Sequence, residues 1–199
     1  MISKNKNIRY EKGTFKNLIN ATKIQMEIFE NARCAFLSFL ECLVTYEYKE
    51  SFYIIYYKDK MAGIISFYDG IYYGKENEIW IAWFGILPKF RRQNIATQTI
   101  KDFCEFWRKK GYNNLRLYSY RKKFYKPAIN FYRKNMDIEE NYNYNYKNEK
   151  IVIFTKNLNK SHYEKWNNKD IFYYSDKLEE KSSLVLWKSI YGGNYGKKN

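Results

Sequence analysis

The stretch that decides the fold lies at residues 84–97, which read Phe84-Gly85-Ile86-Leu87-Pro88-Lys89-Phe90-Arg91-Arg92-Gln93-Asn94-Ile95-Ala96-Thr97. It joins a nearly continuous apolar run, residues 78–87, to a polar turn and then to a helical pattern over residues 95–110. An unbroken apolar run is typical of a central strand covered on both faces. A turn between such a strand and a helix presents successive backbone N–H groups beside the positive end of the helix dipole. Such a turn is suited to bind a pyrophosphate.

Two side chains suit this turn to an anion. Ala96 is small, so that a phosphate can approach the backbone. Asn94 belongs to the few residue types besides glycine that tolerate the left-handed backbone region. The pattern alone is also that of an ordinary strand-to-helix connection.

The same residues resemble a motif of the GNAT superfamily of acetyl-CoA-dependent N-acetyltransferases, which reads apolar-x-Val-x-Pro-x-aromatic-Arg/Gln-x-x-Gly-x-Gly/Ala. The matching residues are Ile86 at the Val position, Pro88, Phe90, Arg91, Asn94 and Ala96. The chain departs from the motif at Asn94, where the family usually has glycine. Residues 128–136 resemble the family block Ala-x-x-aromatic-Tyr-x-Lys-x-Gly-Phe, and the match is good through Lys134. Tyr125 stands where the family often has an asparagine, which puts that pantetheine contact in doubt.

The resemblance covers about residues 7–158 and implies an α/β (α+β) GNAT fold, with a central mixed, mostly antiparallel sheet flanked by helices. Residues 1–158 would form the acyltransferase domain, and residues 159–199 a C-terminal extension without an assigned role. Hydrophobic periodicity predicts the remaining elements. The expected strands are 7–12, 52–57, 62–67, 115–120 and 151–155, and the expected helices are 15–31 with Thr14 as N-cap, 33–46 and 127–134. The Asn-Tyr alternation at 141–146 is read as a loop or a hairpin edge.

The resemblance also implies roles for individual residues. The central strand would separate from its neighbour beside a bulge, and its backbone would bind the pantetheine arm like an added strand. A backbone N–H there would polarise the thioester carbonyl. Tyr132 would protonate the departing CoA thiolate as general acid. The cofactor-binding residues implied are Phe84, Gly85, Ile86, Arg91, Arg92, Gln93, Asn94, Ile95, Ala96 and Thr97.

The general base is less well defined by the sequence. Direct attack needs a neutral amine, so that a group or a water must take its proton. Glu78, at the start of the central strand, is the leading candidate, and a structural carboxylate at a strand end is the alternative. Further candidates are Asp69, Glu76, Glu139 and Glu140. Residues 139–149 are both acidic and aromatic, which suggests that they capture a cationic amine.

Charge and composition narrow the class of protein. The formal net charge is +15, and most of it lies between residues 89 and 134, so this segment should face a polyanion such as a nucleotide cofactor. A single histidine, His162, and three cysteines without a CxxC pair argue against a usual zinc site, and we expect no metal. No Ser-His-Asp or Cys-His constellation stands out, which favours transfer without a covalent enzyme intermediate.

The sequence therefore predicts an N-acetyltransferase that moves an acetyl group from acetyl-CoA to a primary amine of a small molecule or a protein. Two alternatives remain open. Acetylation of an RNA-linked amine such as aminoacyl-tRNA is suggested by the basic run 121–123, although nucleic acid is the less favoured partner. The other alternative is a CoA-binding module without turnover. The absence of a long apolar stretch or signal-peptide pattern predicts a cytoplasmic protein that does not enter a membrane, as a monomer or homodimer.

Overall fold

The computed structural model describes residues 2, 5–29, 35–44, 51–70, 75–144, 149–159 and 164–166. Its helices and strands are β1 (Ile8–Lys12), α1 (Leu18–Ile28), α2 (Ala35–Val44), β2 (Ser51–Tyr57), β3 (Lys60–Asp69), β4 (Glu78–Ile86), α3 (Ile95–Lys109), β5 (Asn114–Tyr120), α4 (Lys126–Asn135), β6 (Ile138–Tyr144) and β7 (Glu149–Asn157). This order agrees with the predicted one, with β6 as an additional strand. The segment read as a loop or hairpin edge thus begins as an edge strand paired with β7.

The strands form one sheet in the order β1-β2-β3-β4-β5-β7-β6. Neighbouring strands are antiparallel except β4 and β5, which are parallel. The mixed, mostly antiparallel sheet expected from the resemblance is therefore confirmed.

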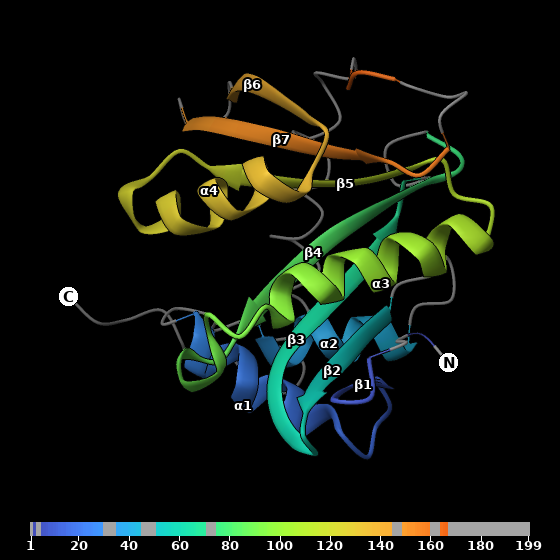
Figure 1. The fold of residues 1–199 in the computed structure, drawn as a ribbon, viewed down its shortest axis with the longest axis vertical. Helices are drawn as coiled ribbons and strands as arrows, with labels where there is room; N and C mark the ends of the chain where they lie inside the picture. The colour runs from blue at the N-terminus through green and yellow to red at the C-terminus, as the bar shows by residue number, and fades with distance from the viewer. Residues whose placement is uncertain are drawn as a thin grey trace, which may run out of the picture.

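Helices cover both faces of this sheet (Figure 1). In Figure 1, α3 crosses in front of β2–β4, α4 lies in front of β5 and β7, and α1 and α2 lie behind. Buried residues of α3 and α4, including Phe103 and Tyr132, share one apolar core with Ile79 and Phe154 of the sheet. Residues of α1 and α2 form a second core on the opposite face, around Ile54 and Ile64.

The first helix begins later than predicted. Asn17 accepts a hydrogen bond from the backbone N–H of Thr14 at 2.8 Å and donates one to Glu11 Oε1 at 2.8 Å. These bonds fold residues 14–17 into a turn, and α1 starts at Leu18. The prediction of Thr14 as N-cap is therefore wrong, because the asparagine side chain organises the approach to the helix.

A gap in strand pairing divides the sheet. β4 and β5 pair only from Glu78↔Asn114 to Trp80↔Arg116. β4 nevertheless continues beside β3 as far as Ile86↔Gly63, with a register shift opposite Ser66. The backbone N–H of Trp83 donates to Ser66 Oγ at 3.1 Å in this bulge. Residues 81–86 therefore present an unpaired edge toward β5, and we call this gap the β4–β5 opening. The bulge and the separation of the strands expected from the sequence are both confirmed.

Candidate active site

The β4–α3 turn lies at the wide end of the opening. A short 3-10 turn, Pro88–Phe90, ends β4, and residues 91–94 then lead into α3. Asn94 has φ 60° and ψ 9°, so the predicted left-handed conformation is confirmed. Arg92 also has φ 60°, a conformation that costs a non-glycine residue free energy and persists only where the surrounding structure fixes it. Left-handed residues occur in turns whose successive backbone N–H groups form an anion-binding concavity.

The start of α3 leaves backbone donors available. The first helical hydrogen bond joins the N–H of Gln98 to the carbonyl of Asn94 at 3.1 Å. The preceding N–H groups of Ile95, Ala96 and Thr97 therefore have no partner within the helix. Together with the helix dipole, these amides suit an anionic group.

The two arginines of the turn have different surroundings. Arg91 Nε donates to the carbonyl of Ile86 at 3.0 Å, which ties the turn back to the end of β4. Both arginines are exposed, as are Gln93 and Asn94, so the difference between them is this hydrogen bond. Arg92 is therefore the guanidinium better placed to meet an anion, whereas Arg91 shapes the turn.

The unpaired edge of β4 is closely packed from behind. A Cβ atom on Gly85 would lie 2.5 Å from Ile28 Cγ2, so α1 packs against the strand where only glycine fits. A Cβ on Gly63 of β3 would lie 2.4 Å from the carbonyl oxygen of Gly85. These contacts fix the backbone of the expected pantetheine-binding residues and leave their polar edge facing the opening.

Tyr132 lies on α4, beside the same opening. Its ring contacts Phe131 and Phe154, with ring centroids 5.4 and 5.5 Å apart, and Phe131 in turn contacts Phe84 of β4 at 6.1 Å. Tyr132 is 7% exposed, and burial raises the pKa of its hydroxyl well above its usual range. The phenol therefore keeps its proton at neutral pH, as a general acid must before the reaction.

Glu78 lies apart from the β4–α3 turn, and it points to the face of the sheet opposite Ile79, which shares a core with Tyr132. It is six residues before Phe84, which corresponds to about 20 Å along an extended strand. Its carboxylate forms a two-pronged ion pair with Arg116, with Nη2–Oε1 at 2.7 Å and Nε–Oε2 at 2.9 Å. Both side chains are almost completely buried. This geometry favours a structural role, because the carboxylate neutralises a buried guanidinium.

Of the other carboxylates named as candidate bases, Glu76 is exposed, whereas Asp69, Glu139 and Glu140 have partners. Asp69 accepts a hydrogen bond from the Tyr112 hydroxyl at 2.8 Å, and burial together with this carboxylate raises the pKa of Tyr112. Glu139 accepts two bonds from Arg133, at 2.7 and 2.8 Å, and these hold its pKa below the usual range.

Glu139 and Glu140 do not act as a pair. They are neighbours on β6, so their side chains point to opposite faces of the sheet. Glu140 Oε2 accepts the backbone N–H of Trp166 at 2.9 Å, whereas Glu139 binds α4 through Arg133. The hypothesis that residues 139–149 capture a cationic amine stays a prediction, and both carboxylates already have partners within the protein. Residues 145–148 of the proposed capture segment lie outside the described residues.

Sequence reasoning missed two residues near the opening. Arg116 interrupts the apolar run of β5, and a charge in such a strand is the signal for a buried opposite charge, here Glu78. Trp166 packs on Trp80 with ring centroids 4.9 Å apart. Trp166 stands in a polar stretch without clear periodicity, where a single large apolar side chain was the only indication of a buried contact.

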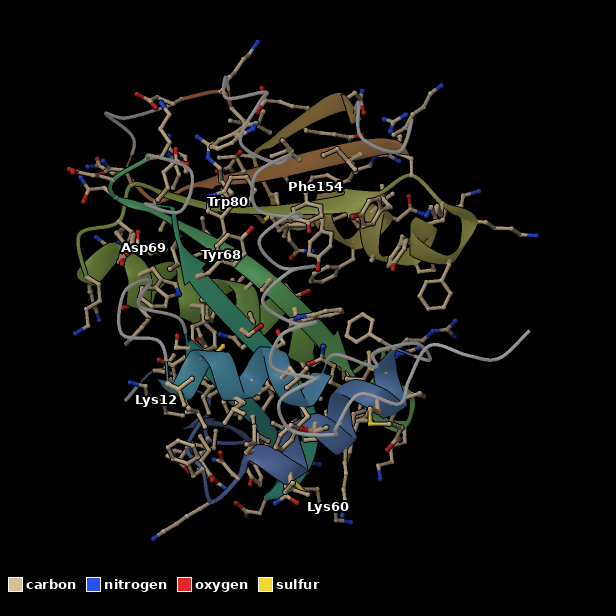
Figure 2. The ribbon with its side chains drawn as sticks, turned by 180° about the vertical axis from the view of Figure 1, so that it is seen from behind. Lys12, Lys60, Tyr68, Asp69, Trp80 and Phe154 are labelled. Atoms are coloured by element: carbon tan, nitrogen blue, oxygen red, sulfur yellow. The ribbon has the colours of Figure 1, made fainter. Side chains whose placement is uncertain are left out.

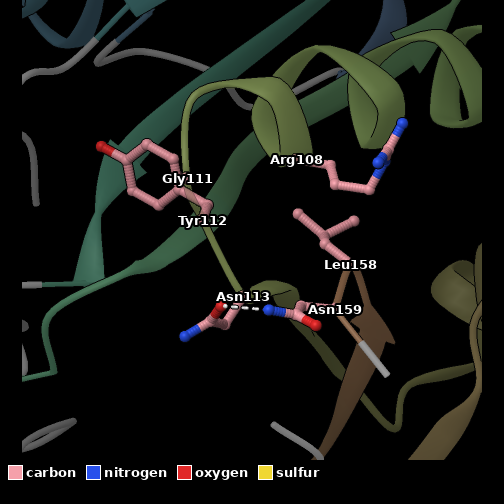
Figure 3. Close-up of a pocket in the computed structure, with 6 residues that line it drawn as sticks. All are labelled: Arg108, Gly111, Tyr112, Asn113, Leu158 and Asn159. Carbon is pink, nitrogen blue, oxygen red and sulfur yellow. Dashed lines mark hydrogen bonds between the residues drawn. The ribbon is translucent and has the colours of Figure 1, made fainter. Parts of the chain in front are cut away.

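A pocket of about 280 Å³ lies at the far end of α3 from the β4–α3 turn (Figure 3). It is lined by Arg108, Gly111, Tyr112, Asn113, Leu158 and Asn159. At 1.5 Å per residue, the length of α3 separates it from Ile95 by about 20 Å. It is therefore not part of the candidate active site.

Comparisons with known proteins agree with this geometry. The model of the acetyltransferase (GNAT) family matches residues 18–137, and the chain belongs to this family. As a family member with this fold it is an acyltransferase. No curated protein sequence gives a significant match.

Several solved structures share the fold. A protein from Desulfovibrio desulfuricans assigned to the GNAT family has a TM-score of 0.65 and 14% identity, covering 76% of this chain and 99% of that one. The ribosomal-protein-S18-alanine N-acetyltransferase of Escherichia coli has a TM-score of 0.59 and 14% identity, covering 80% and 99%. A GNAT acetyltransferase from Elizabethkingia anophelis, solved with acetyl-CoA bound, has a TM-score of 0.59 and 15% identity, covering 77% and 99%. At these identities the likeness shows the fold alone.

Within the part of the chain that the structure describes, every helix is too short or too polar to cross a membrane.

Proposed function

We propose that the protein transfers an acetyl group from acetyl-CoA to a primary amine by direct attack. The observation that carries this proposal is the β4–β5 opening, whose unpaired edge leads from Ile81 to the β4–α3 turn. This arrangement suits a donor with an extended amide-bearing arm and a pyrophosphate. The arm adds to β4 as a strand would, and the pyrophosphate receives N–H groups from residues 92–97.

The chemistry follows from the groups on either side of the opening. The neutral amine attacks the thioester carbon, and a backbone N–H of residues 84–86 stabilises the oxyanion. The tetrahedral intermediate then collapses, the C–S bond breaks, and Tyr132 gives its proton to the thiolate. The amine loses a proton to water and the product amide leaves, while Tyr132 regains its proton from solvent. The proposal gives Glu78 no base role, because its carboxylate is held by Arg116.

Acetylation of an RNA-linked amine receives less support. It was suggested by the basic run 121–123, but two of these side chains have partners on the protein. Arg121 binds Glu139 and Asn141, and the Lys122 ammonium lies 5.2 Å from the centre of the Tyr120 ring. The charges of Arg121 and Lys122 thus partly serve contacts between the segment after β5 and strands β5 and β6.

The test is a thiol-release assay with acetyl-CoA and a panel of primary amines, run beside a thermal-shift titration with acetyl-CoA. We expect stabilisation by the donor and amine-dependent release of CoA. Stabilisation by acetyl-CoA without release of CoA for any amine would indicate a CoA-binding module without turnover. Absence of both would refute the proposed donor.

A further inference from the structure

The β4–β5 opening is closed where the two strands pair and accessible beyond that point. Trp80, in the last residue pair, is fully buried and stacks on Tyr68 with ring centroids 6.1 Å apart (Figure 2). Two positions further along β4, Ala82 is exposed, and residues 83–85 are half-buried. A donor bound along β4 therefore extends toward the end at which the strands have separated, which we call the mouth.

Two turns flank the mouth, because β4 and β5 are parallel and their carboxyl ends lie at the same edge of the sheet. β4 leads into the β4–α3 turn, and β5 leads through residues 121–125 into α4. Phe131 of α4 and Phe84 of β4 meet across the opening, with ring centroids 6.1 Å apart. Phe124 lies seven residues before Phe131, about 10 Å along the axis of α4 toward its start. Residues 121–126, which we call the basic turn, therefore lie on the α4 side of the mouth, across from the β4–α3 turn.

The basic turn carries positive charge that the protein does not use. It opens a segment, residues 121–134, with six basic side chains and no acidic one. Both arginines of this segment bind Glu139, and the Lys122 ammonium lies over a tyrosine ring. Lys123 and Lys126 are exposed, and neither ammonium group has an ion pair or hydrogen bond with any residue that the structure describes. Their charges are therefore available to an anion.

An exposed aromatic ring lies between these two lysines. Phe124 is 60% exposed. Its ring meets that of Tyr125 with centroids 5.1 Å apart and an interplanar angle of 90°, and Tyr125 in turn contacts Tyr120 at 6.2 Å. A phenylalanine that is supported by neighbouring rings and flanked by free ammonium groups suits a planar group linked to a phosphate.

The basic turn differs from the β4–α3 turn in the donors that it offers. Pro127, in the first turn of α4, has no N–H, whereas α3 begins with three N–H groups that have no partner within the helix. The basic turn thus offers lysine ammonium groups and a ring more than a row of backbone amides. It is suited to a second phosphate, separate from the pyrophosphate expected at residues 92–97.

The donor of the proposed function carries such a group. Beyond its pyrophosphate, CoA has a ribose with a 3′-phosphate and an adenine ring. A pyrophosphate bound at the start of α3 leaves this end of the molecule at the mouth. The adenine offers a planar face to Phe124, and the 3′-phosphate offers negative charge to the two lysines.

We propose that the basic turn binds the adenosine 3′-phosphate end of acetyl-CoA, with Phe124 stacked on the adenine and the ammonium groups of Lys123 and Lys126 on the 3′-phosphate. This inference rests on the proposed function. The two ammonium groups distinguish CoA from 3′-dephospho-CoA, which lacks this phosphate, whereas the stacking contact is the same for both.

The first test compares two ligands that differ only in the 3′-phosphate. Calorimetric titration of the full-length protein with CoA and with 3′-dephospho-CoA requires no knowledge of the amine. We expect CoA to bind about 10-fold more tightly, because only CoA gains the charge-assisted hydrogen bonds of the lysines. Equal affinities would overturn the inference.

Variants assign the effect to individual side chains. Combining Lys123→Gln with Lys126→Gln should weaken CoA binding about 10-fold and leave 3′-dephospho-CoA binding unchanged. Phe124→Ala should weaken both ligands about 5- to 10-fold, because both carry the adenine, and Phe124→Tyr should restore most of this loss. The matched control combines Lys16→Gln with Lys23→Gln, which removes two exposed lysines at α1, on the other face of the sheet. An equal loss for both ligands in the basic-turn lysine variant, or the same loss in the control, would remove these lysines from the 3′-phosphate.

The inference and the proposed function fail in different ways. If both ligands bind the wild type and all variants equally well, the inference is wrong and the proposed donor stands. If neither ligand binds the wild type, both are wrong.

Nucleic acid offers the same combination of base and phosphate, so that a second titration uses single-stranded oligouridine, followed by fluorescence polarisation. We expect the basic-turn lysine variant to lose its preference for CoA over 3′-dephospho-CoA. Weaker oligouridine binding with an unchanged preference for CoA would assign the basic turn to RNA and overturn the inference.

Discussion

Glu78 and Arg116 face each other across the parallel strands β4 and β5, joined by hydrogen bonds of 2.7 and 2.9 Å and almost fully buried. Removing one partner of such a pair leaves a buried charge unpaired, which costs about 3–5 kcal/mol. We expect Glu78→Gln to lower the free energy of unfolding by this amount, as measured by urea denaturation.

The control for this prediction is Glu105→Gln, because Glu105 forms a partly exposed helical ion pair with Lys109 at 3.0 Å. Such pairs contribute little, so its urea midpoint should hardly move. An unchanged midpoint for Glu78→Gln would show that the ion pair is not needed for stability. Normal stability combined with lost turnover would return Glu78 to the role of general base.

The left-handed conformation of Asn94 makes a second prediction. Asn94→Gly should leave the melting temperature close to that of the wild type, because glycine adopts φ 60° without strain. Asn94→Val should lower the stability by about 1–2 kcal/mol, because a β-branched residue disfavours this region. Calorimetry measures the melting temperatures of both variants. Equal melting temperatures would mean that the turn can rearrange.

Charge reversal at the β4–α3 turn tests the donor site. Arg92→Glu places a carboxylate beside the expected pyrophosphate and should abolish most of the thermal stabilisation by acetyl-CoA. Lys23→Glu changes the net charge equally on the exposed surface of α1 and should retain that stabilisation. If both variants respond to acetyl-CoA like the wild type, the pyrophosphate binds elsewhere.

Tyr132→Phe removes the expected proton donor and keeps the ring. We expect kcat to fall about 10²-fold with little change in acetyl-CoA affinity, the low end for loss of a general acid. Steady-state kinetics and a donor titration measure the two effects separately. Undiminished kcat would mean that water or another group protonates the thiolate.

The pH profile gives an independent check on Tyr132. Burial raises the pKa of its hydroxyl above the ordinary value of 10.0, so that the proton is lost only at higher pH. The wild-type kcat should therefore not fall through deprotonation of Tyr132 as the pH approaches 10. A decline centred well below pH 10 would point to a different acid.

Much of the fold could be predicted because local patterns and architecture agree. The apolar run from Glu78 to Ile86, the polar turn after it and the amphipathic α3 appear where periodicity indicates. Asn94 took the left-handed conformation because its residue type tolerates what the turn requires. The start of α1 was missed because Asn17 binds Thr14 and Glu11, a side-chain competition that periodicity does not register.

The candidate site was less predictable, because its decisive contacts join distant residues. Glu78 carries a carboxylate, as a general base could, but Arg116 binds that carboxylate from 38 positions away in the chain. Two hydrogen bonds to the backbone hold Trp166 at the sheet: Glu164 O accepts from Arg116, and Trp166 N–H donates to Glu140. Because these bonds use backbone atoms of residues 164 and 166, the identities of those two residues do not reveal them. The sequence places residues along the chain, whereas these pairings depend on which face of the sheet each side chain occupies.

The three residue pairs that join β4 to β5 have a mechanical consequence. They form a narrow seam between two half-sheets, β1–β4 and β5–β7. The separated part of β4 extends six residues past Trp80, a lever of about 20 Å. A tilt of about 5° at the seam moves the mouth of the opening by about 2 Å over this length. Glu78 and Arg116 cross the seam at its fulcrum, so their ion pair adds to the backbone pairing and the shared core that resist widening of the mouth.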